Sequence, residues 1–520
     1  MSTHLAAARS DRRAFLRSAG LLSLATVSGL VAAAPSRARA AAGPVVSTDP
    51  SDDLLYMSAT KLAGLIRAKK VSAVEAVEVA IARHLEVNDR LNAVVMNCYT
   101  RARAEARAAD AALARGEIKG PLHGVPMTLK DSIDTEGVIT TGATYGRQQY
   151  IPTHDATVTA RVRAAGAILL GKTNTPEFTL GGLGGISTSS NLLYGSSHNP
   201  YDLTRTTSGS SGGAGAIVAA GGAWFDIGSD WGGSIRGPAH ANGIAGIKPT
   251  SVLVPRTGHI VDYGGVFDLW QQLGPMARRI EDLTLITRLI AGPDFKDASC
   301  APVPWRDPAA VELKKLRVCF FPTNPVTKAD ADTQATVLAA VKWLEPEVAS
   351  VTEDFPRDIL ADLYDARRAL TNGDAWAFFK RLADKWGTKN FSPSVKTRMA
   401  TMQPVSSADY VEAWERHDLA KSRMLQWFKK YDVLICPTAA TPAGEIDGED
   451  VGGGGMGWSY TNPFNTTGWP GTVVRCGTST DGRKLPIGLQ VIAAPWRDDI
   501  TLAVATHLEA KGGGYQRPPI

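Results

Sequence analysis

The chain has 520 residues, of which 44% are hydrophobic and 21% are charged, so it can bury a large core and is too apolar for global disorder. Its formal net charge of +5 comes from residues 1–40, which hold six arginines and one aspartate, and the remaining chain has fifty basic and fifty acidic residues. That balance gives no electrostatic support to nucleic-acid binding, and we expect no nucleic-acid partner.

The first forty residues have the parts of a bacterial export signal. Arg12 and Arg13 form a twin-arginine pattern, an apolar run of small residues follows, and an Ala-x-Ala sequence at 38–40 offers a cleavage site. No later stretch has 18 consecutive apolar residues. We therefore expect a twin-arginine signal over 1–40, no stable membrane span after its cleavage, and a periplasmic or secreted protein over 41–520.

The first part of the mature chain is predicted to be helical. Ser58 can cap a helix over 59–70, and Ser72 with Glu75 forms an S-x-x-E capping box before a second helix. An alanine-rich stretch with alternating arginines and acids predicts a third helix over 100–115.

Strand and helix patterns then alternate along the chain. Short apolar strands are predicted over 125–129, 167–171 and 224–228, and helices over 157–165 and 212–220. This alternation indicates an α/β fold with a mixed, mostly parallel, twisted central sheet that helices cover on both faces.

The composition changes in the C-terminal part. Residues 305–430 are rich in tryptophan, alanine, lysine and other charged residues at helical spacing, and we expect a helical insertion within the domain. Strand patterns return over 431–437 and 486–494, and a C-terminal helix is predicted over 498–510.

Two glycine-rich stretches and one lysine indicate the chemistry. Ser210 and Ser211 lie within SGSSGG, Ser234 ends DWGGS, and Lys130 follows the apolar run VPMTL. Serine becomes a nucleophile when a nearby base takes its proton, and a lysine that burial keeps uncharged can be that base. Glycines allow successive N–H groups to converge on one oxygen, as a tetrahedral oxyanion requires. The set indicates acyl-transfer hydrolysis.

Other interpretations of these motifs fit less well. The segment 209–213 also matches the G-x-S-x-G nucleophile elbow with Ser211 as nucleophile. That motif needs a buried strand before it and a late histidine, but residues 200–208 are polar and the late histidines lie in helix-like surroundings. Ser234 can also be read as the capping serine of a tight turn. No P-loop sequence is present.

We expect neither a metal nor a cofactor. The five cysteines contain no CxxC pair, and neither an HExxH motif nor a cluster of cysteine and histidine is present. The sequence leaves open whether any disulfide forms.

Seven motifs, in order, resemble those of the amidase signature family. They span nearly the whole chain after the signal and are LHGVPMTLKD (122–131), GKTNTPE (171–177), SGSSGG (208–213), GSDWGGSIR (228–236), GIKPT (246–250), NPFN (462–465) and LPIGLQ (485–490). Within the family the sequence is most similar to the broad bacterial amidases, such as peptide amidase and aminohexanoate cyclic-dimer hydrolase. The resemblance implies the amidase signature fold over 41–520 and hydrolysis of a carboxylic amide to an acid and an amine or ammonia.

The resemblance also implies a Ser–cis-Ser–Lys triad. Carried over residue by residue, Ser234 is the nucleophile and Lys130 is the base. Ser210, which follows a cis peptide bond from Gly209 in this family, relays the proton between them. Acylation of Ser234 releases the amine, and water then frees the acid.

Substrate-binding residues follow from the same resemblance. The backbone N–H groups of Trp231, Gly232 and Gly233, with that of the nucleophile, are expected to line the oxyanion pocket. Ser211 and Thr179 are expected to contact substrate.

Three residues near the nucleophile have other expected tasks. Trp231 stands where many relatives have a small or branched residue, and its bulk either shapes the pocket or packs inside the protein. Asp230 and Arg236 are expected to brace the nucleophile loop rather than to touch substrate.

More than one function is compatible with this machinery. An exported amidase acting on a small-molecule amide is the leading expectation, and an ester, urethane or aryl-anilide hydrolase would use the same triad. A glutaminase-type subunit of a tRNA-dependent amidotransferase is an alternative of another class, against which the export signal argues. An inactive binding protein is disfavoured because all three triad positions are present. The substrate and the oligomeric state stay open.

Overall fold

The computed structural model describes residues 54–183, 188–262, 265, 269–446 and 457–520. The expected export signal lies outside the described residues, and the fold below is that of the compact unit formed by residues 49–520. None of the helices in the described part of the chain is long and apolar enough to cross a membrane.

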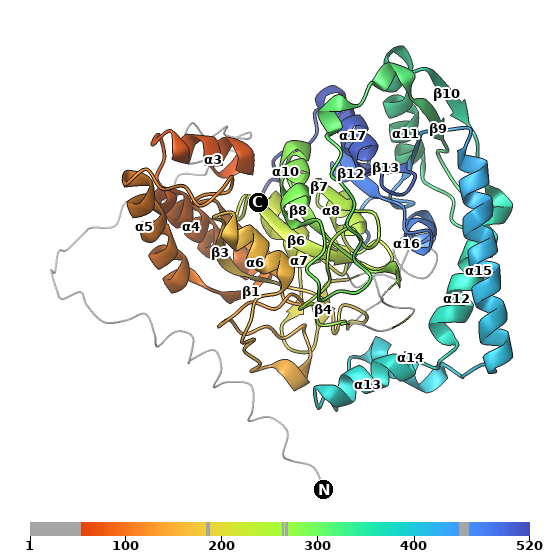
Figure 1. The fold of residues 1–520 in the computed structure, drawn as a ribbon, viewed down its shortest axis with the longest axis horizontal. Helices are drawn as coiled ribbons and strands as arrows, with labels where there is room; N and C mark the ends of the chain where they lie inside the picture. The colour runs from red at the N-terminus through yellow and green to blue at the C-terminus, as the bar shows by residue number, and fades with distance from the viewer. Residues whose placement is uncertain (1–53, 184–187, 263–264, 266–268, 447–456) are drawn as a thin grey trace, which may run out of the picture. The chain divides into compact units, whose positions relative to one another are not determined.

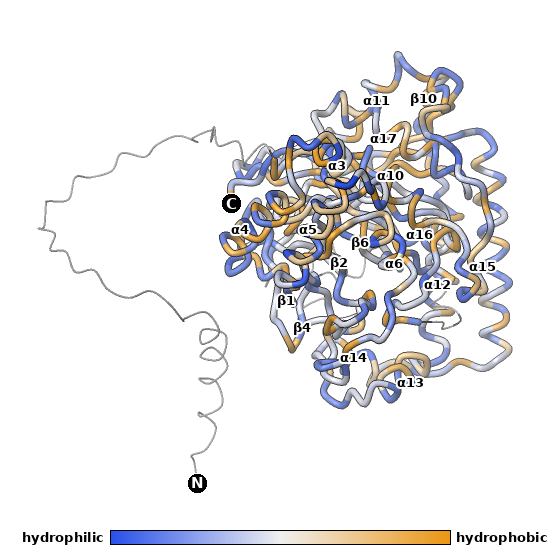
Figure 2. Tube along the Cα trace, turned by 60° about the vertical axis from the view of Figure 1, so that its left-hand side comes forward, coloured by the Kyte–Doolittle hydropathy of each residue, from blue (hydrophilic) through white to orange (hydrophobic). Residues whose placement is uncertain are grey.

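Three helices open this unit, and two of them have the caps that the sequence predicted. They are α3 (Ala59–Arg67), α4 (Ala73–Leu91) and α5 (Tyr99–Ala114). The N–H of Lys61 donates to Oγ of Ser58 at 3.1 Å, and both halves of the Ser72–Glu75 capping box are present. Polar and apolar residues alternate around α4, so that one side of the helix faces the core (Figure 2).

A three-stranded sheet carries Lys130. Its order is β1 (Val94–Asn97), β3 (Ile168–Thr173) and β2 (Pro126–Lys130), and the helix α6 (Thr157–Ala164) separates β2 from β3 in the sequence. β2 and β3 are parallel, and all their residues are buried. Strands that are buried on both faces read as continuous apolar runs, which is why the sequence predicted both.

Within the described residues, the central sheet has eight strands. Their order is β10 (Ser350–Glu353), β9 (Arg317–Phe320), β11 (Val433–Pro437), β13 (Pro486–Ala493), β12 (Gly471–Thr478), β7 (Ala245–Lys248), β8 (Gln272–Ala277) and β6 (Phe225–Asp230). Two further short strands, β4 (Ser190–Asn191) and β5 (Gly195–Ser196), pair with each other.

The mixed character of the sheet is confirmed, but the expectation that it is mostly parallel is wrong. The pairs β10–β9 and β9–β11 are parallel, and the other neighbouring pairs in this sheet are antiparallel. The short segment 479–485 joins β12 to β13 and cannot form the crossover that parallel strands need. β8 lies between β6 and β7 and runs antiparallel to both.

Helices cover both faces of the central sheet (Figure 1). In β11, Val433 and Ile435 belong to a core shared with α10 (Ile280–Ile290), α11 (Ala331–Leu344) and α17 (Asp498–Gly512). The alternate residues Leu434 and Cys436 belong to a second core shared with α15 (Ser407–Phe428) and α16 (Asn462–Thr466). Side chains that alternate along a strand point to opposite faces, so each face has its own helical layer. The helices α7 (Gly212–Ala219) and α8 (Arg236–Ala241) complete the unit near the site.

The sequence had suggested a helical insertion over 305–430, but this segment is not purely helical. It contains α11, α12 (Arg357–Asn372), α13 (Ala377–Lys385), α14 (Pro393–Thr401) and α15, but also β9 and β10, which extend the central sheet at one edge. Strands of four residues are too short for periodicity to separate them from a helical background. α12 and α15 lie side by side (Figure 1).

Candidate active site

Lys130 ends β2 with its side chain fully buried. Its Nζ lies 2.5 Å from Oγ of Ser210, 2.9 Å from Oγ of Ser229 and 3.1 Å from Oγ of Ser211. No ion pair joins this amine to a carboxylate among the described residues. Hydroxyl groups can donate to an uncharged amine as well as accept from an ammonium, so this environment suits either protonation state.

Burial lowers the pKa of Lys130 to about 7, although the charges of Asp226 and Asp230 act in the opposite direction. Lys172 and Lys248 are also buried, and burial lowers their pKa values as well. Each of their Nζ atoms donates to a main-chain carbonyl, and that of Lys172 also donates to the hydroxyl of Thr135 at 3.0 Å. The Nζ of Lys130 instead faces three serine hydroxyls and, within the described part of the chain, no carbonyl. Lys130 therefore differs from the other two buried lysines in its three serine hydroxyl neighbours rather than in its burial.

Asp226 of β6 ties the two sheets together behind Lys130. Its Oδ2 accepts the hydroxyl of Thr128 in β2 at 2.7 Å and that of Thr173 in β3 at 3.0 Å. Burial raises the pKa of this carboxyl to about 7, against the hydrogen bonds from both threonines. These contacts fix the end of β2 against β6, and β6 leads into the GSDWGGSIR motif, which carries Ser234.

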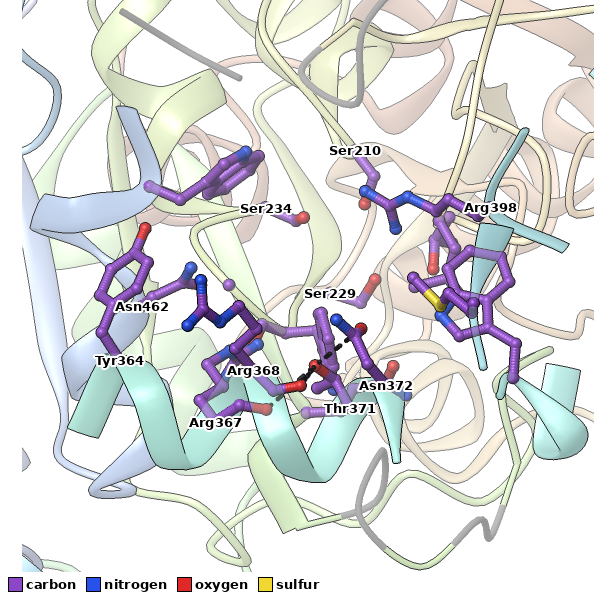
Figure 3. Close-up of a pocket in the computed structure, with 18 residues that line it drawn as sticks. Ser210, Ser229, Ser234, Tyr364, Arg367, Arg368, Thr371, Asn372, Arg398 and Asn462 are labelled. Carbon is purple, nitrogen blue, oxygen red and sulfur yellow. Dashed lines mark hydrogen bonds between the residues drawn. The ribbon is translucent and has the colours of Figure 1, made fainter. Parts of the chain in front are cut away.

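Ser210 follows a cis peptide bond from Gly209, as the family resemblance implied. The hydroxyl of Ser189 donates to the carbonyl of Ser210 at 3.1 Å, and the N–H of Ser211 donates to the carbonyl of Ser234 at 3.1 Å. The SGSSGG and GSDWGGSIR motifs are thus hydrogen-bonded to each other. Ser210 and Ser234 both line the same pocket (Figure 3).

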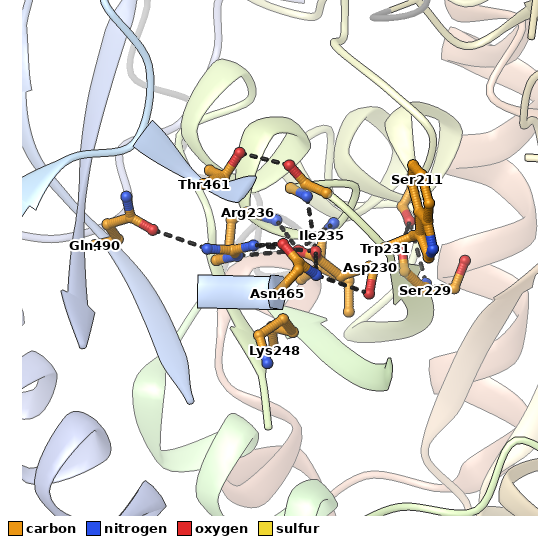
Figure 4. A network of polar contacts seen from close by, with 12 residues as sticks. Ser211, Ser229, Asp230, Trp231, Ile235, Arg236, Lys248, Thr461, Asn465 and Gln490 are labelled. Carbon is orange, nitrogen blue, oxygen red and sulfur yellow. Dashed lines mark hydrogen bonds and ion pairs between the residues drawn. The ribbon is translucent and has the colours of Figure 1, made fainter. Parts of the chain in front are cut away.

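One buried carboxylate holds the turn between β6 and α8. Asp230 accepts the N–H groups of Gly233 at 2.7 Å, Ile235 at 3.1 Å and Arg236 at 3.3 Å. The guanidinium of Arg236 donates to both carboxylate oxygens at 3.1 Å, and Asn465 Nδ2 donates to one of them at 2.8 Å (Figure 4). Asp230 and Arg236 therefore brace the loop, as expected.

The charge of Asp230 is well compensated. Burial raises the pKa of this carboxyl, but the charge and hydrogen bonds of Arg236, with the hydrogen bond from Asn465, bring it well below its ordinary value. Gln490 accepts from the other side of the Arg236 guanidinium at 3.0 Å. The turn that carries Ser234 thus rests on a buried ion pair whose polar groups are largely satisfied.

The expectation that the N–H of Gly233 lines the oxyanion pocket is wrong. That N–H donates to Asp230 Oδ1, because the aspartate side chain folds back over the turn three residues ahead of it. Among the residues that the structure describes, the N–H groups of Gly232 and Ser234 donate to no acceptor. These two groups can therefore receive a substrate oxygen.

A pocket of about 360 Å³ opens in front of the two serines. The turn after β6 forms one side, and α12 with α14 contributes another (Figure 3). Six of its lining residues are apolar or aromatic: Leu180, Trp231, Tyr364, Trp376, Met402 and Trp458. Three of them are arginines: Arg367, Arg368 and Arg398.

The remaining predicted contact residues divide between pocket and interior. Thr179 lines the pocket, as expected. Ser211 does not, because it directly precedes α7 with its side chain turned inward, fully buried, toward Lys130. Trp231 lines the pocket and also contacts Trp270, so its bulk both shapes the site and packs against the interior.

Sequence reasoning missed the pocket residues of α12. Tyr364, Arg367, Arg368 and Thr371 stand at positions i, i+3, i+4 and i+7, which marks one face of a helix. Nothing in the sequence says what that face meets. Ser229 was also missed, although it lies inside the GSDWGGSIR motif, five residues before the nucleophile candidate.

Among the described residues, no group of histidine, cysteine, aspartate or glutamate is arranged to hold a metal ion. The five cysteines are buried and unpaired.

Comparison with known proteins identifies the family. The family model described as Amidase matches residues 75–502, which is most of the chain. The chain therefore belongs to the amidase signature family, which confirms the resemblance seen in the motifs. It is a hydrolase of this family, which acts on carbon–nitrogen bonds.

Three relatives show the range of proteins that the chain resembles. A glutamyl-tRNA(Gln) amidotransferase subunit of Moorella thermoacetica (strain ATCC 39073 / JCM 9320) is 35% identical over 497 residues, covering 90% of this chain and 99% of that protein. The structure of 6-aminohexanoate cyclic dimer hydrolase complexed with substrate has a TM-score of 0.77 and 28% identity, covering 89% of this chain and 99% of the other. The peptide amidase PAM in complex with the competitive inhibitor chymostatin has a TM-score of 0.76 and 25% identity, with the same coverage.

We predict that Asp230→Asn destabilises the protein by about 3–5 kcal/mol, because it leaves the buried guanidinium of Arg236 without its counter-ion. Urea unfolding of the purified variant measures this change. Asp365→Asn is the matched control, because it breaks an exposed pair with Arg368 and should change stability by less than about 1 kcal/mol. Equal, small effects of both substitutions would contradict the bracing role of Asp230.

Proposed function

We propose that this protein is an exported amidase that hydrolyses a carboxylic amide through an acyl-enzyme on Ser234. One observation carries the proposal: the fully buried Nζ of Lys130 lies 2.5 Å from Oγ of Ser210, and Ser210 and Ser234 line the same pocket. Lys130 is then the base, Ser210 the relay and Ser234 the nucleophile, as the family resemblance implied.

The reaction begins with a proton relay from Ser234 through Ser210 to Lys130. Uncharged Lys130 takes the proton of the Ser210 hydroxyl while Ser210 takes that of Ser234, and Ser234 Oγ forms a bond to the amide carbonyl carbon. The carbonyl oxygen becomes an oxyanion, which accepts the N–H groups of Gly232 and Ser234. The pKa of Lys130, lowered to about 7 by burial, allows the amine to be uncharged near neutral pH.

Collapse of the tetrahedral intermediate completes the first half of the reaction. The proton returns from Lys130 through Ser210 to the amide nitrogen, the carbon–nitrogen bond breaks, and the amine or ammonia leaves. The acyl group stays on Ser234 as an ester. Water, deprotonated by the same relay, attacks this ester and releases the carboxylic acid.

Gln271 favours amides over esters as substrates. It lines the pocket but is only 3% exposed, and its Nε2 donates to His259 Nδ1 at 2.9 Å and to the carbonyl of Val261 at 3.2 Å. Its Oε1 has no partner among the described residues, so an acceptor is left for a group in the pocket. An amide N–H can donate to it, whereas an ester has no such donor. Esters, urethanes and aryl anilides remain outcomes of the substrate screen below.

The identity to the amidotransferase protein of Moorella thermoacetica favours one second candidate, a glutaminase-type subunit of an amidotransferase. Two points weigh against it. Free glutamine carries an ammonium group, but the described lining residues include three arginines and no aspartate or glutamate. The predicted twin-arginine signal would also separate the protein from tRNA in the cytoplasm. The Arg12–Arg13 pattern and the Ala-x-Ala sequence at 38–40 support export.

We predict that Ser234→Ala removes both amide hydrolysis and covalent labelling by a fluorophosphonate. Turnover should fall by about 10⁴-fold or more, because the variant lacks the attacking oxygen. The mature protein, purified without partners, is assayed on matched amides, anilides, esters and peptide amides, and labelling is read by intact-protein mass spectrometry. Ser211→Ala should keep the label, since Ser211 faces Lys130 and not the pocket. Label retained in Ser234→Ala but lost in Ser211→Ala would instead support the nucleophile elbow.

We predict that kcat/KM falls about tenfold per pH unit below a midpoint near 7, because protonated Lys130 cannot act as base. Asp226→Asn should move this midpoint to lower pH, since it removes a negative charge that favours the ammonium form. Glu117→Gln, an exposed carboxylate paired with Arg115, should leave the midpoint in place. A rate that stays level down to about pH 4, where carboxylates titrate, would remove Lys130 from the role of base.

A further inference from the structure

A buried arginine from α12 contacts the loop that carries the nucleophile. Arg367 is 5% exposed, and its Nη2 donates to the carbonyl of Trp231 at 2.7 Å, across 136 positions of sequence. Its guanidinium carbon lies 4.1 Å from the ring centroid of Trp231 and 4.5 Å from that of Trp270. A weaker contact of 3.4 Å joins Nη1 to the hydroxyl of Thr466. Main chain and aromatic rings thus surround the charge.

No carboxylate among the described residues forms an ion pair with Arg367. A buried charge without a counter-ion is costly, and burial lowers the pKa of this guanidinium to about 9, which still leaves it charged at neutral pH. The strongest partner that the charge has is the Trp231 carbonyl. A positive charge is therefore held beside the turn where the amide oxygen would become negative.

The carbonyl of Trp231 and the N–H of Gly232 belong to one peptide unit. That unit is trans, so its C=O and N–H point in opposite directions. Gly232 lines the pocket, and its N–H has no acceptor among the described residues. A charged donor on the carbonyl side polarises the peptide and makes the N–H on the other side a stronger donor. Arg367 can thus act on the oxyanion through this peptide.

We propose that Arg367 is a positioning residue, which orients and polarises the peptide between Trp231 and Gly232 so that the Gly232 N–H stabilises the oxyanion. The inference rests on the proposed function, because it needs Ser234 to form a tetrahedral intermediate. It assigns α12 a catalytic consequence: the helix from segment 305–430 completes the oxyanion site as well as forming a pocket wall.

The test compares two substitutions at this position with one control. Arg367→Met removes the donor and the charge but keeps an unbranched apolar stem, and Arg367→Lys keeps a charged donor. Arg423→Met is the control, because Arg423 pairs with Asp362 of α12 at the protein surface and lies outside the site. Thermal unfolding of every variant establishes that it is folded.

The first readout is the second-order rate constant for fluorophosphonate labelling of Ser234, which needs no knowledge of the natural substrate. We expect Arg367→Met to lower it by about 10- to 100-fold, somewhat less than loss of an oxyanion donor itself, because the N–H remains but is misplaced and less polarised. Arg367→Lys should recover part of the loss. Arg423→Met should label within about twofold of the wild type, as an exposed pair contributes little.

The second readout separates positioning from substrate binding. With the best amide from the screen, Arg367→Met should lower kcat while KM stays within about twofold, because the interaction is made in the transition state. A raised KM with unchanged kcat, a labelling rate equal to the wild type, or Arg367→Lys as slow as Arg367→Met would each overturn the proposal. Failure of the proposed function looks different, since the wild type itself would then not be labelled at Ser234.

Discussion

The chemistry of this protein depends on the environment of a single amino group. Lys130 is buried at the end of a strand, and its Nζ contacts three serine hydroxyl groups and, among the residues that the structure describes, no carboxylate. The charges of Asp226 and Asp230 favour the ammonium form, but burial outweighs them, and Asp230 is itself paired with Arg236. If Lys130 were exposed, it would be an ammonium at neutral pH, and the serines beside it would have no base.

The rest of the site supports that amine from separate parts of the chain. Asp226 fixes β2 to β6 through two threonine hydroxyls, and Asp230 fixes the turn after β6. A helix of a later segment then contributes Arg367 to the same turn. Each support is a buried polar group with specific partners, which constrains geometry more sharply than apolar packing does. This explains how Lys130 and Ser210, which are 80 positions apart in the sequence, can be held at hydrogen-bond distance.

Local features of the sequence predicted local structure well. The caps at Ser58 and Ser72 and the buried strand before Lys130 appear in the structure where they were expected. Each depends on a few neighbouring residues, so no knowledge of the fold is needed. The motifs also brought Ser210 and Lys130 together correctly, but only because they resemble those of a family, since their spacing alone does not determine a distance.

The errors have a common physical origin in tertiary contacts. The direction of strands in the central sheet depends on which strands become neighbours. β8 lies between β6 and β7, and no local pattern in its sequence predicts that position. The N–H of Gly233 looked available because the motif does not show that Asp230 folds back onto it. The sequence predicted that Arg367 lies in a helix, but it gave no indication that the side chain contacts the loop of the nucleophile. Side-chain direction and long-range partners were thus beyond what local patterns contain.

These observations make one physical claim central: the amine of Lys130 is uncharged in a large share of molecules at neutral pH. The most direct measurement is an NMR titration of protein that contains lysine labelled with ¹³C at Cε, with the Lys130 signal assigned by its absence in Lys130→Met. That assignment matters because burial also lowers the pKa of Lys248 to about 7. We expect a midpoint near 7 for Lys130. A midpoint near the ordinary lysine value of about 10.4 would contradict it.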